Sequence, residues 1–341
     1  MDAILVTGGA GFIGSNFTRY FLNHHPQCRV IVLDALTYAG NLTNLEGLEA
    51  TGRFEFVHGD IGDRTVVDQV MAKVDAVVNF AAESHVDRSI LNAGAFIESN
   101  FKGVFVLLES SRTHRIHRFL QVSTDEVYGD VPTGSSLESD PFRPRSPYAA
   151  SKASAELLVQ SYFTTYALPV IITRGGNTIG PYQYPEKVVP VFITNALEDK
   201  PLPVYGKGTA IRSYLDVEDH CAGIDLAFRS GLPGEAYNIG TNFEVNGLTL
   251  VDRILALLGK PDSLRQFVTD RPGHDLRYSL DCAKIGTLGW APTFSFDQML
   301  ERTVRWYVDN TPWWQAIKRD QGYQAYYHQQ YEKRSHTPST A

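Results

Sequence analysis

The stretch TGGAGFIGSN, residues 7–16, decides the fold. It follows an apolar run at residues 3–8 and opens a segment of helical periodicity at residues 12–22. Gly8, Gly11 and Gly14 are spaced so that the chain can turn tightly, approach a pyrophosphate closely and pack the helix against the strand. Amide groups at the start of a helix face such an anion. The stretch therefore predicts a dinucleotide site, with a purely structural glycine turn as the alternative.

Further along the chain, apolar runs alternate with segments of helical periodicity. The runs are rich in β-branched residues and apolar on both faces, as in strands of a covered parallel sheet. They lie at residues 29–34, 54–60, 76–82, 119–124 and 169–174, and the helical segments lie at residues 64–71, 95–112 and 148–165. This alternation predicts an α/β fold with a Rossmann-type doubly wound parallel sheet.

An acidic residue ends the second run of the predicted sheet. Asp34 stands twenty residues beyond Gly14. A carboxylate there accepts hydrogen bonds from ribose hydroxyls and repels a 2′-phosphate, which favours NAD over NADP. Asp60 and Ile61 follow the third run and are candidates to contact the adenine, although an aspartate at a strand end is also a common turn residue.

The character of the chain changes after Arg174. Glycine and proline become frequent at residues 176–190 and 200–208, and the regular alternation stops. Helical segments return at residues 218–229, 248–258 and 296–309, with a short strand at residues 236–240. We therefore predict an NAD-binding domain at residues 1–174, to which residues 215–240 return. A smaller, mostly C-terminal α/β lobe at residues 175–330 would bind the substrate, and residues 331–341 would form a polar tail.

Charge and cysteine content exclude several classes of protein. The net charge of −7 argues against a general nucleic-acid-binding surface, and no apolar stretch reaches the length of a membrane span. Cys28, Cys221 and Cys282 are far apart and lack metal-ligand spacing, which indicates a reducing compartment. We therefore expect a cytoplasmic protein without a metal site, a nucleic-acid partner or a membrane partner.

The fifth run ends in an unusual cluster of polar residues. Residues 122–129 read VSTDEVYG, so Thr124, Asp125 and Glu126 follow a buried strand directly. A carboxylate is costly inside a protein unless it is paired, hydrogen-bonded or used, and a solvated turn is the plain alternative. Neighbours on a strand point to opposite faces. The backbone must therefore leave strand geometry near residue 124 if both acids are to reach one ligand.

A tyrosine and a lysine lie four positions apart in the next helical segment. Tyr148 and Lys152, in PYAASKASAE (147–156), would share one face of a helix. Ser123 and Thr124 end the preceding strand at the carboxyl edge, where doubly wound sheets bind ligands. This placement favours a catalytic pair, and a pair on a helix surface is the alternative.

With these motifs the chain resembles the extended short-chain dehydrogenase/reductase family. Within it, the chain is similar to the nucleotide-sugar 4,6-dehydratases, above all those that act on dTDP-glucose, from residue 3 to about residue 318. The further motifs that carry the resemblance are AAESHVDRS (81–89), GPYQYPEKVVP (180–190), VEDH (217–220) and DRPGHDLRY (270–278). Related epimerases share the tyrosine and the lysine, but not both acids after Thr124.

The resemblance implies oxidation of a hexose at C4 by NAD, loss of water across C5–C6 and return of the hydride to C6. Tyr148 would take the C4 hydroxyl proton, its pKa lowered by Lys152 and the nicotinamide charge. Thr124 would hydrogen-bond the C4 oxygen. Glu126 would remove the C5 proton, and a protonated Asp125 would donate to the departing C6 hydroxyl.

The resemblance also implies the other binding residues. The implied cofactor contacts are Gly8, Gly11, Phe12, Ile13, Gly14, Asp34, Asp60, Ile61, Ala81, Ala82, Tyr148 and Lys152. The implied substrate contacts are Ser84, His85, Asn177, Lys187, Arg212, Asn238, Arg271, His274 and Tyr278, with Asp87 and Arg88 near the pocket. A structural ion pair for Arg271 and a merely buried His85 are the plain alternatives.

The chain departs from the dTDP-glucose enzymes at two places. It carries Thr178 and Ile179 where those enzymes have Asn and Tyr, and Tyr214 where they have Trp. UDP-glucose or another dTDP-hexose is therefore an alternative substrate, and a C4 epimerase or a non-catalytic NAD sensor are alternative functions. The family also implies a homodimer through residues 95–112 and 148–165.

Overall fold

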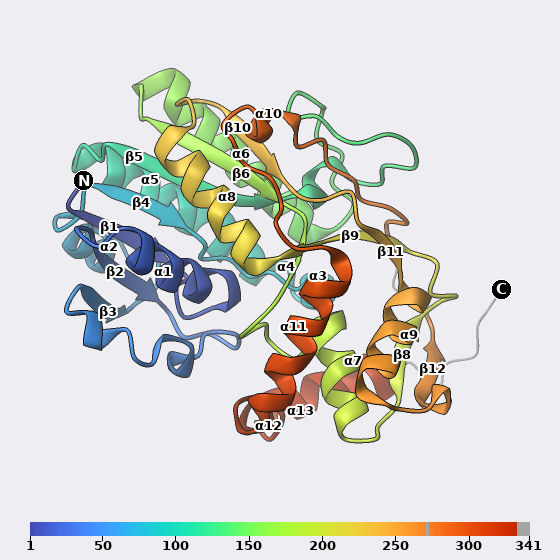
Figure 1. Ribbon diagram of the computed structural model, residues 1–341. Helices are drawn as coiled ribbons and strands as arrows, with labels where there is room; N and C mark the ends of the chain where they lie inside the picture. Colours follow the sequence, from blue (N-terminus) through green and yellow to red (C-terminus); the bar gives the residue numbers. More distant parts are fainter. Residues whose placement is uncertain (271–272, 333–341) are drawn as a thin grey trace.

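The computed structural model describes residues 1–270 and 273–332, and a seven-stranded sheet lies at its centre (Figure 1). The strands are β1 (Ala3–Thr7), β2 (Arg29–Asp34), β3 (Phe54–His58), β4 (Ala76–Asn79), β5 (Arg118–Thr124), β6 (Val170–Gly175) and β10 (Ala236–Ile239). Their order is β3-β2-β1-β4-β5-β6-β10, and all neighbours are parallel. This is the doubly wound arrangement, so the predicted Rossmann-type α/β fold is confirmed.

Helices cover both faces of this sheet. α1 (Phe12–His24) and α8 (Val217–Ser230) pack on one face, and α2 (Arg64–Met71), α5 (Val104–Thr113) and α6 (Pro147–Tyr166) pack on the other (Figure 1). In β1, Ile4 and Val6 belong to the first core and Leu5 belongs to the second, because side chains alternate along a strand. Each such buried side chain contributes about 1.5–3 kcal/mol.

The helix predicted over residues 95–112 is interrupted. It consists of α4 (Ala93–Ile97), a π-helical turn (Glu98–Gly103) and α5. Gly103 lies so close to Ile61 that a Cβ atom would be 2.5 Å from its Cδ1 atom. The absence of a side chain at this position lets the turn approach the end of β3. The turn also brings Ser99 and Lys102 to the wall of a large cavity, which is described in the next subsection.

A third apolar core forms the lobe at the lower right of Figure 1. It contains α7 (Val188–Leu197), α9 (Gly247–Leu258) and α11 (Phe296–Asp309), the last two close to the predicted ranges. Two small sheets accompany them, formed by β7 (Asn177–Ile179), β9 (Ile211–Asp216) and β11 (Glu244–Asn246), and by β8 (Leu202–Tyr205) and β12 (Arg265–Val268). These short strands lie where the sequence indicated irregular structure.

The C-terminal part of the described chain packs on this lobe. α12 (Thr311–Lys318), α13 (Gln321–Tyr327) and a π-helical turn (His328–Glu332) end it. The remaining short helices are α3 (Val86–Leu91), α10 (Ala283–Gly286) and 3₁₀ turns at Leu42–Leu45, Glu49–Thr51 and Asp262–Leu264. The prediction that the polar tail begins at residue 331 is wrong at Tyr331, which is buried among aromatic rings. Residues 333–341 lie outside the described residues.

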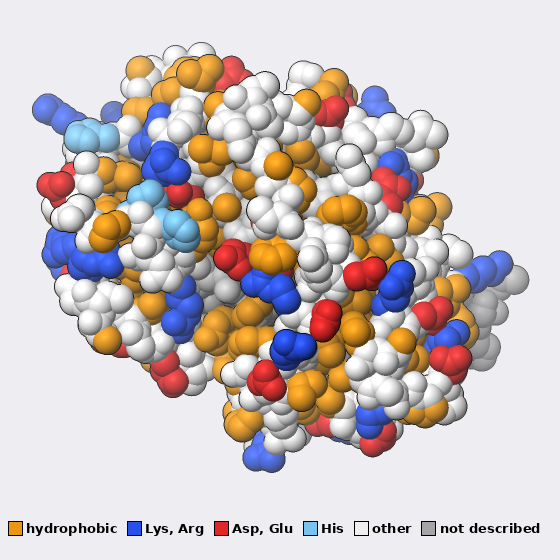
Figure 2. Space-filling view, in the orientation of Figure 1, with side chains coloured by type: hydrophobic (Ala, Val, Ile, Leu, Met, Phe, Trp, Pro, Cys, Tyr) orange, Lys and Arg blue, Asp and Glu red, His pale blue; other side chains and the backbone are white. Residues whose placement is uncertain are grey.

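The surface mixes both signs of charge. On the face shown in Figure 2, acidic and basic side chains are interspersed over the sheet domain and the smaller lobe. Among the helices of residues 1–270 and 273–332, none combines the length and apolar character that a membrane crossing requires.

Candidate active site

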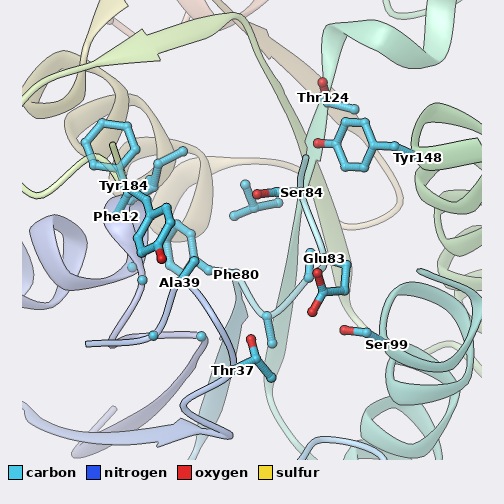
Figure 3. A pocket seen from close by; sticks show the side chains of 18 of the residues that line it. Phe12, Thr37, Ala39, Phe80, Glu83, Ser84, Ser99, Thr124, Tyr148 and Tyr184 are labelled. Carbon is cyan, nitrogen blue, oxygen red and sulfur yellow. The ribbon is translucent and has the colours of Figure 1, made fainter. Parts of the chain in front are cut away.

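A cavity of about 720 Å³ lies along the carboxyl ends of the central strands. Its wall runs from the glycine turn and Asp34 to Tyr148 and Lys152. In Figure 3, Tyr148 lies beside Thr124 with its hydroxyl pointing into the cavity, and Thr37 lies near the bottom of the view. The cavity therefore joins the predicted phosphate, ribose and reaction sites in one space.

The glycine turn is packed too tightly for side chains. A Cβ atom at Gly14 would lie 2.3 Å from the Gly8 carbonyl oxygen, and one at Gly8 would lie 2.6 Å from the Ala81 nitrogen. Gly8 also has a φ of +68°, a conformation that favours glycine. α1 begins at Phe12 without a side-chain cap, so its first amide groups stay available for an anion at the cavity wall.

Asp34 is fixed where a ribose would lie. Its Oδ2 atom accepts from the Ala10 amide at 2.9 Å, and its Oδ1 atom accepts from the Leu36 amide at 2.8 Å. Burial raises the pKa of this carboxyl, and the two amides oppose that shift. Each oxygen keeps a second acceptor direction. Asp60 and Ile61 also line the cavity.

The chain leaves strand geometry directly after Thr124, as predicted. A 3₁₀ turn, Asp125–Tyr128, follows β5 and carries both carboxylates to the cavity wall. Thr124 Oγ1 donates to Asp125 Oδ1 at 3.1 Å and accepts from the Glu126 amide at 3.3 Å. The hydroxyl thus links the end of the strand to both acids.

The environment of Asp125 favours its protonated form. Burial and the nearby Glu126 carboxylate raise the pKa of Asp125 to about 7, while Arg212 and Thr124 oppose the shift. A neutral Asp125 beside an ionised Glu126 is the expected result when two carboxyls share a poorly solvated site.

Tyr148 and Lys152 reach the cavity from the first turns of α6. Ser146 caps this helix by accepting from the Ala149 amide at 3.1 Å. Lys152 Nζ donates to the Val122 carbonyl oxygen at 2.7 Å, and burial lowers the pKa of Lys152 to about 8. Burial and the Glu126 carboxylate raise the pKa of Tyr148, whereas a hydrogen bond with Thr124 opposes that rise. The predicted lowering depends on the nicotinamide charge as well as on Lys152 and stays a prediction.

A second cavity, of about 200 Å³, adjoins the first. Glu126, Asn177 and Lys187 line both, so Glu126 lies at their junction. Of the other predicted substrate contacts, Ser84 lines the first cavity, and His85, Arg212, His274 and Tyr278 line the second. The structure therefore brings together residues from five distant segments of the chain.

The positively charged side chains that line the second cavity are fixed by hydrogen bonds to neighbouring backbone groups. Arg212 donates to the Ile211 and Asp275 carbonyl oxygens, and its guanidinium lies 4.3 Å from the centre of the Tyr278 ring. Lys187 Nζ donates to the Ser84 carbonyl oxygen at 2.7 Å. Their positions in the wall suit an anionic diphosphate.

Asn238 lines neither of these two cavities, contrary to the prediction that it contacts the substrate. Its side chain is fully buried beneath the sheet edge, where it accepts from the Tyr128 hydroxyl and donates to the Ser136 and Asp281 carbonyl oxygens. A polar side chain so deeply placed must be satisfied internally, and this one is. Arg271, another predicted contact, lies outside the described residues.

Sequence reasoning missed several residues of both cavities. Thr37, Tyr38, Glu83, Ser99 and Tyr184 line the first, and Tyr205 and Tyr331 line the second. Tyr38 follows Asp34 by four residues and Glu83 lies inside the AAESHVDRS motif, so their neighbours in sequence were the available signal. Tyr331 carried no such signal because it stands in a polar sequence.

The departures at residues 178 and 214 are accommodated at the wall of the first cavity. Thr178 Oγ1 lies 2.8 Å from His220 Nδ1 and donates to the Gly176 carbonyl oxygen. Tyr214 is buried and lines both cavities. The substitutions therefore lie in the walls of the cavities in which cofactor and substrate are predicted to bind.

A dinucleotide cavity, a Tyr–Lys pair and an adjoining cavity with cations are features of extended short-chain dehydrogenases/reductases that act on nucleotide sugars. A sequence profile of the GDP-mannose 4,6 dehydratase family matches residues 5–303, and the chain belongs to this family. It is an NAD-dependent nucleotide-sugar 4,6-dehydratase, a hydro-lyase.

Individual relatives agree with this family. The low-salt glycan biosynthesis protein Agl12 of Haloferax volcanii is 50% identical over 89% of this chain and 98% of its own. A dTDP-glucose 4,6-dehydratase of Actinoplanes is 49% identical over 91% of this chain and 99% of its own. The crystal structure of DesIV, a dTDP-glucose 4,6-dehydratase of Streptomyces venezuelae with NAD bound, superposes with a TM-score of 0.91 at 49% identity, covering 93% and 100% of the two chains.

The residues of the first cavity fit NAD. The glycine turn leaves room for a pyrophosphate where any side chain would intrude, and Asp34 offers carboxylate oxygens to a ribose. Ser123 Oγ is buried in the same wall and has no hydrogen-bond partner within residues 1–270 and 273–332. NAD would therefore be held by Gly8–Gly14, Asp34 and the end of β5.

Proposed function

We propose that the protein is a dTDP-glucose 4,6-dehydratase, which converts dTDP-glucose to dTDP-4-keto-6-deoxyglucose. The single observation that carries this proposal is the placement of Asp125 and Glu126 on one turn, both lining the cavity beside Thr124. An epimerase needs no second acid at this position. The names of the relatives support dTDP-glucose as the substrate.

Thr124 and Tyr148 act on the C4 hydroxyl. Tyr148 receives its proton, and Thr124 hydrogen-bonds the same oxygen and the phenol. NAD supplies the hydride acceptor and the positive nicotinamide charge, which counteracts the burial that raises the pKa of Tyr148. Lys152, fixed by the Val122 carbonyl, adds positive charge when protonated.

Glu126 and Asp125 carry out the elimination. A ketone at C4 makes the C5 proton acidic, and Glu126 removes it from the junction of the two cavities. Asp125, whose pKa of about 7 keeps a large fraction protonated near neutrality, donates to the departing C6 hydroxyl. One water leaves, and the later reduction at C6 makes the overall reaction redox-neutral.

The same proposal assigns the binding of NAD and of the nucleotide sugar to separate parts of the chain. Residues 1–174, with about 215–240, would bind NAD. Residues 175–330 would mostly bind the nucleotide sugar, with Arg212 and Lys187 near the diphosphate. A cytoplasmic location is supported by the three unpaired cysteines.

We further propose a homodimer. Ile97, Phe101 and Phe105 are spaced by four residues and are 56%, 38% and 45% exposed, and Leu157 on α6 is 62% exposed. An apolar stripe on two adjacent helices is costly in water and suits a second copy of the same helices.

The decisive experiment is mass spectrometry of purified protein with dTDP-glucose, and with UDP-glucose in parallel. We expect loss of one water from dTDP-glucose with no net change in NAD. A faster reaction of UDP-glucose would overturn the proposed nucleotide. An isomer of unchanged mass, or no product from either sugar, would overturn the proposed reaction.

A further inference from the structure

Tyr128 ends the 3₁₀ turn that carries Asp125 and Glu126. It is almost fully buried and lines neither of the two cavities described above. Its hydroxyl accepts from Arg174 Nη1 at 2.6 Å and donates to Asn238 Oδ1 at 2.8 Å. The far end of the catalytic turn is therefore tied to two side chains that the reaction does not use.

Both partners of Tyr128 are themselves fixed. Arg174, on β6, donates from Nε and Nη2 to the Glu156 carboxylate of α6 at 2.9 and 2.8 Å. Arg174 Nη1 also donates to the Glu138 carbonyl oxygen at 2.9 Å. Asn238, on β10, donates to the Ser136 and Asp281 carbonyl oxygens. Tyr128 thus joins the turn to α6 and to two strands of the sheet.

This anchor concerns only two of the five proposed catalytic residues. Thr124 belongs to β5, where it pairs with Gly175 of β6, and Tyr148 and Lys152 belong to α6. Asp125 and Glu126 lie on the turn itself, between Thr124 and the Tyr128 anchor. A shift of the turn would therefore move the two acids without moving the groups that act at C4.

We propose that Tyr128, held by Arg174 and Asn238, is a positioning residue for the elimination step. It keeps the Asp125 and Glu126 carboxyls in place against C6 and C5 of the sugar, and it has no part in oxidation at C4. The inference rests on the proposed roles of these two acids. It also gives Asn238 a function other than the substrate contact that the family resemblance implied.

The test is Tyr128→Phe, which removes one hydroxyl and keeps the ring. Misplacement of a reacting group by about 1 Å can lower a rate about 100-fold, so we expect kcat to fall about 10- to 100-fold with KM unchanged. Reduced cofactor should accumulate on the enzyme during turnover, seen by its near-ultraviolet absorbance, because C4 oxidation continues while elimination slows. A merely structural role would lower both steps and leave the cofactor oxidised.

Tyr162→Phe is the matched control. Tyr162 is also buried on α6 and donates to Glu109 Oε1 at 2.7 Å, away from the turn. This variant should turn over like the wild type without reduced cofactor. Accumulation in Tyr162→Phe, or none in Tyr128→Phe, would overturn the inference.

Asn238→Ala gives a second route should Tyr128→Phe not fold. If Asn238 positions the turn through Tyr128, the Asn238→Ala enzyme should also accumulate reduced cofactor at an unchanged KM. A raised KM without reduced cofactor would indicate that Asn238 contacts the nucleotide, and it would overturn the inference. Glu126→Gln separates the two proposals. If Glu126→Gln accumulates reduced cofactor and Tyr128→Phe does not, only the inference fails; if Glu126→Gln turns over normally, the proposed function fails.

Discussion

Asp125 and Glu126 are sequence neighbours to which the proposed mechanism gives opposite protonation states. The proposed elimination requires a proton on Asp125 and none on Glu126. Burial of Asp125 and the charge of Glu126 raise the pKa of Asp125 to about 7, so the two residues differ through their surroundings and not through their chemistry.

The pKa of Asp125 has a consequence for stability. An unfolded aspartate titrates near 3.8, so the folded protein holds this proton more tightly up to a pH of about 7. The contribution of Asp125 to the free energy of unfolding is fully present below pH 3.8 and is lost as the pH rises through about 7. Asparagine does not titrate, so Asp125→Asn does not lose stability in this way. The free energy of unfolding of the variant should therefore exceed that of the wild type by an amount that grows between pH 3.8 and about 7. The difference should reach about 4 kcal/mol.

Denaturant unfolding at several pH values measures this difference. Asp309→Asn, at an exposed aspartate, is the control and should show no such trend. A difference between Asp125→Asn and the wild type that is constant with pH would contradict the assignment.

Glu126→Gln removes the proposed C5 base and keeps the size of the side chain. We expect dehydration to fall by about 100-fold or more, the scale of general-base catalysis. NAD binding should be unchanged, because the cofactor contacts lie on other residues. Turnover by mass spectrometry and bound NAD after gel filtration check both parts; normal dehydration would remove Glu126 from the mechanism.

At the scale of elements, the cofactor site depends on how closely α1 packs against β1. Gly14, in the first turn of α1, stands against the Gly8 carbonyl at the end of β1. This contact aims the first amides of α1 into the cavity. Helix and site are therefore positioned by the same interface.

Gly14→Ala places a methyl group 2.3 Å from the Gly8 oxygen, a distance that real contacts do not reach. We expect a loss of stability of about 1–3 kcal/mol or more and loss of bound NAD, measured by thermal unfolding and by the cofactor that copurifies. Gly286→Ala, in α10, has open space around the new methyl group and should be neutral. Retained NAD in Gly14→Ala would show that the turn can relax.

At the scale of the whole molecule, one helical layer has two tasks. The inner sides of α5 and α6 complete the core of the sheet, and α6 also carries Tyr148 and Lys152. The outer side leaves Phe105 and Leu157 exposed. Association on this side would stiffen the helix that holds the catalytic pair.

The double variant Phe105→Glu, Leu157→Glu tests the homodimer. Charges facing each other across a two-fold interface repel, so we expect monomers by light scattering at concentrations where the wild type is a dimer. Leu257→Glu, at a 45% exposed leucine on α9 of the smaller lobe, should remain dimeric. A wild type that is monomeric throughout would contradict the proposed dimer.

The sequence by itself determined the sheet, the glycine turn and the departure from strand geometry after Thr124. These features depend on local patterns: β-branched runs, glycines where no Cβ fits, and neighbouring residues that must share one ligand. The tertiary structure alone decided the break at residues 98–103, the burial of Tyr331, the place of Asn238 beneath the sheet edge and the raised pKa of Tyr148. Each of these depends on which distant side chains and charges surround a residue, and local sequence does not carry that information.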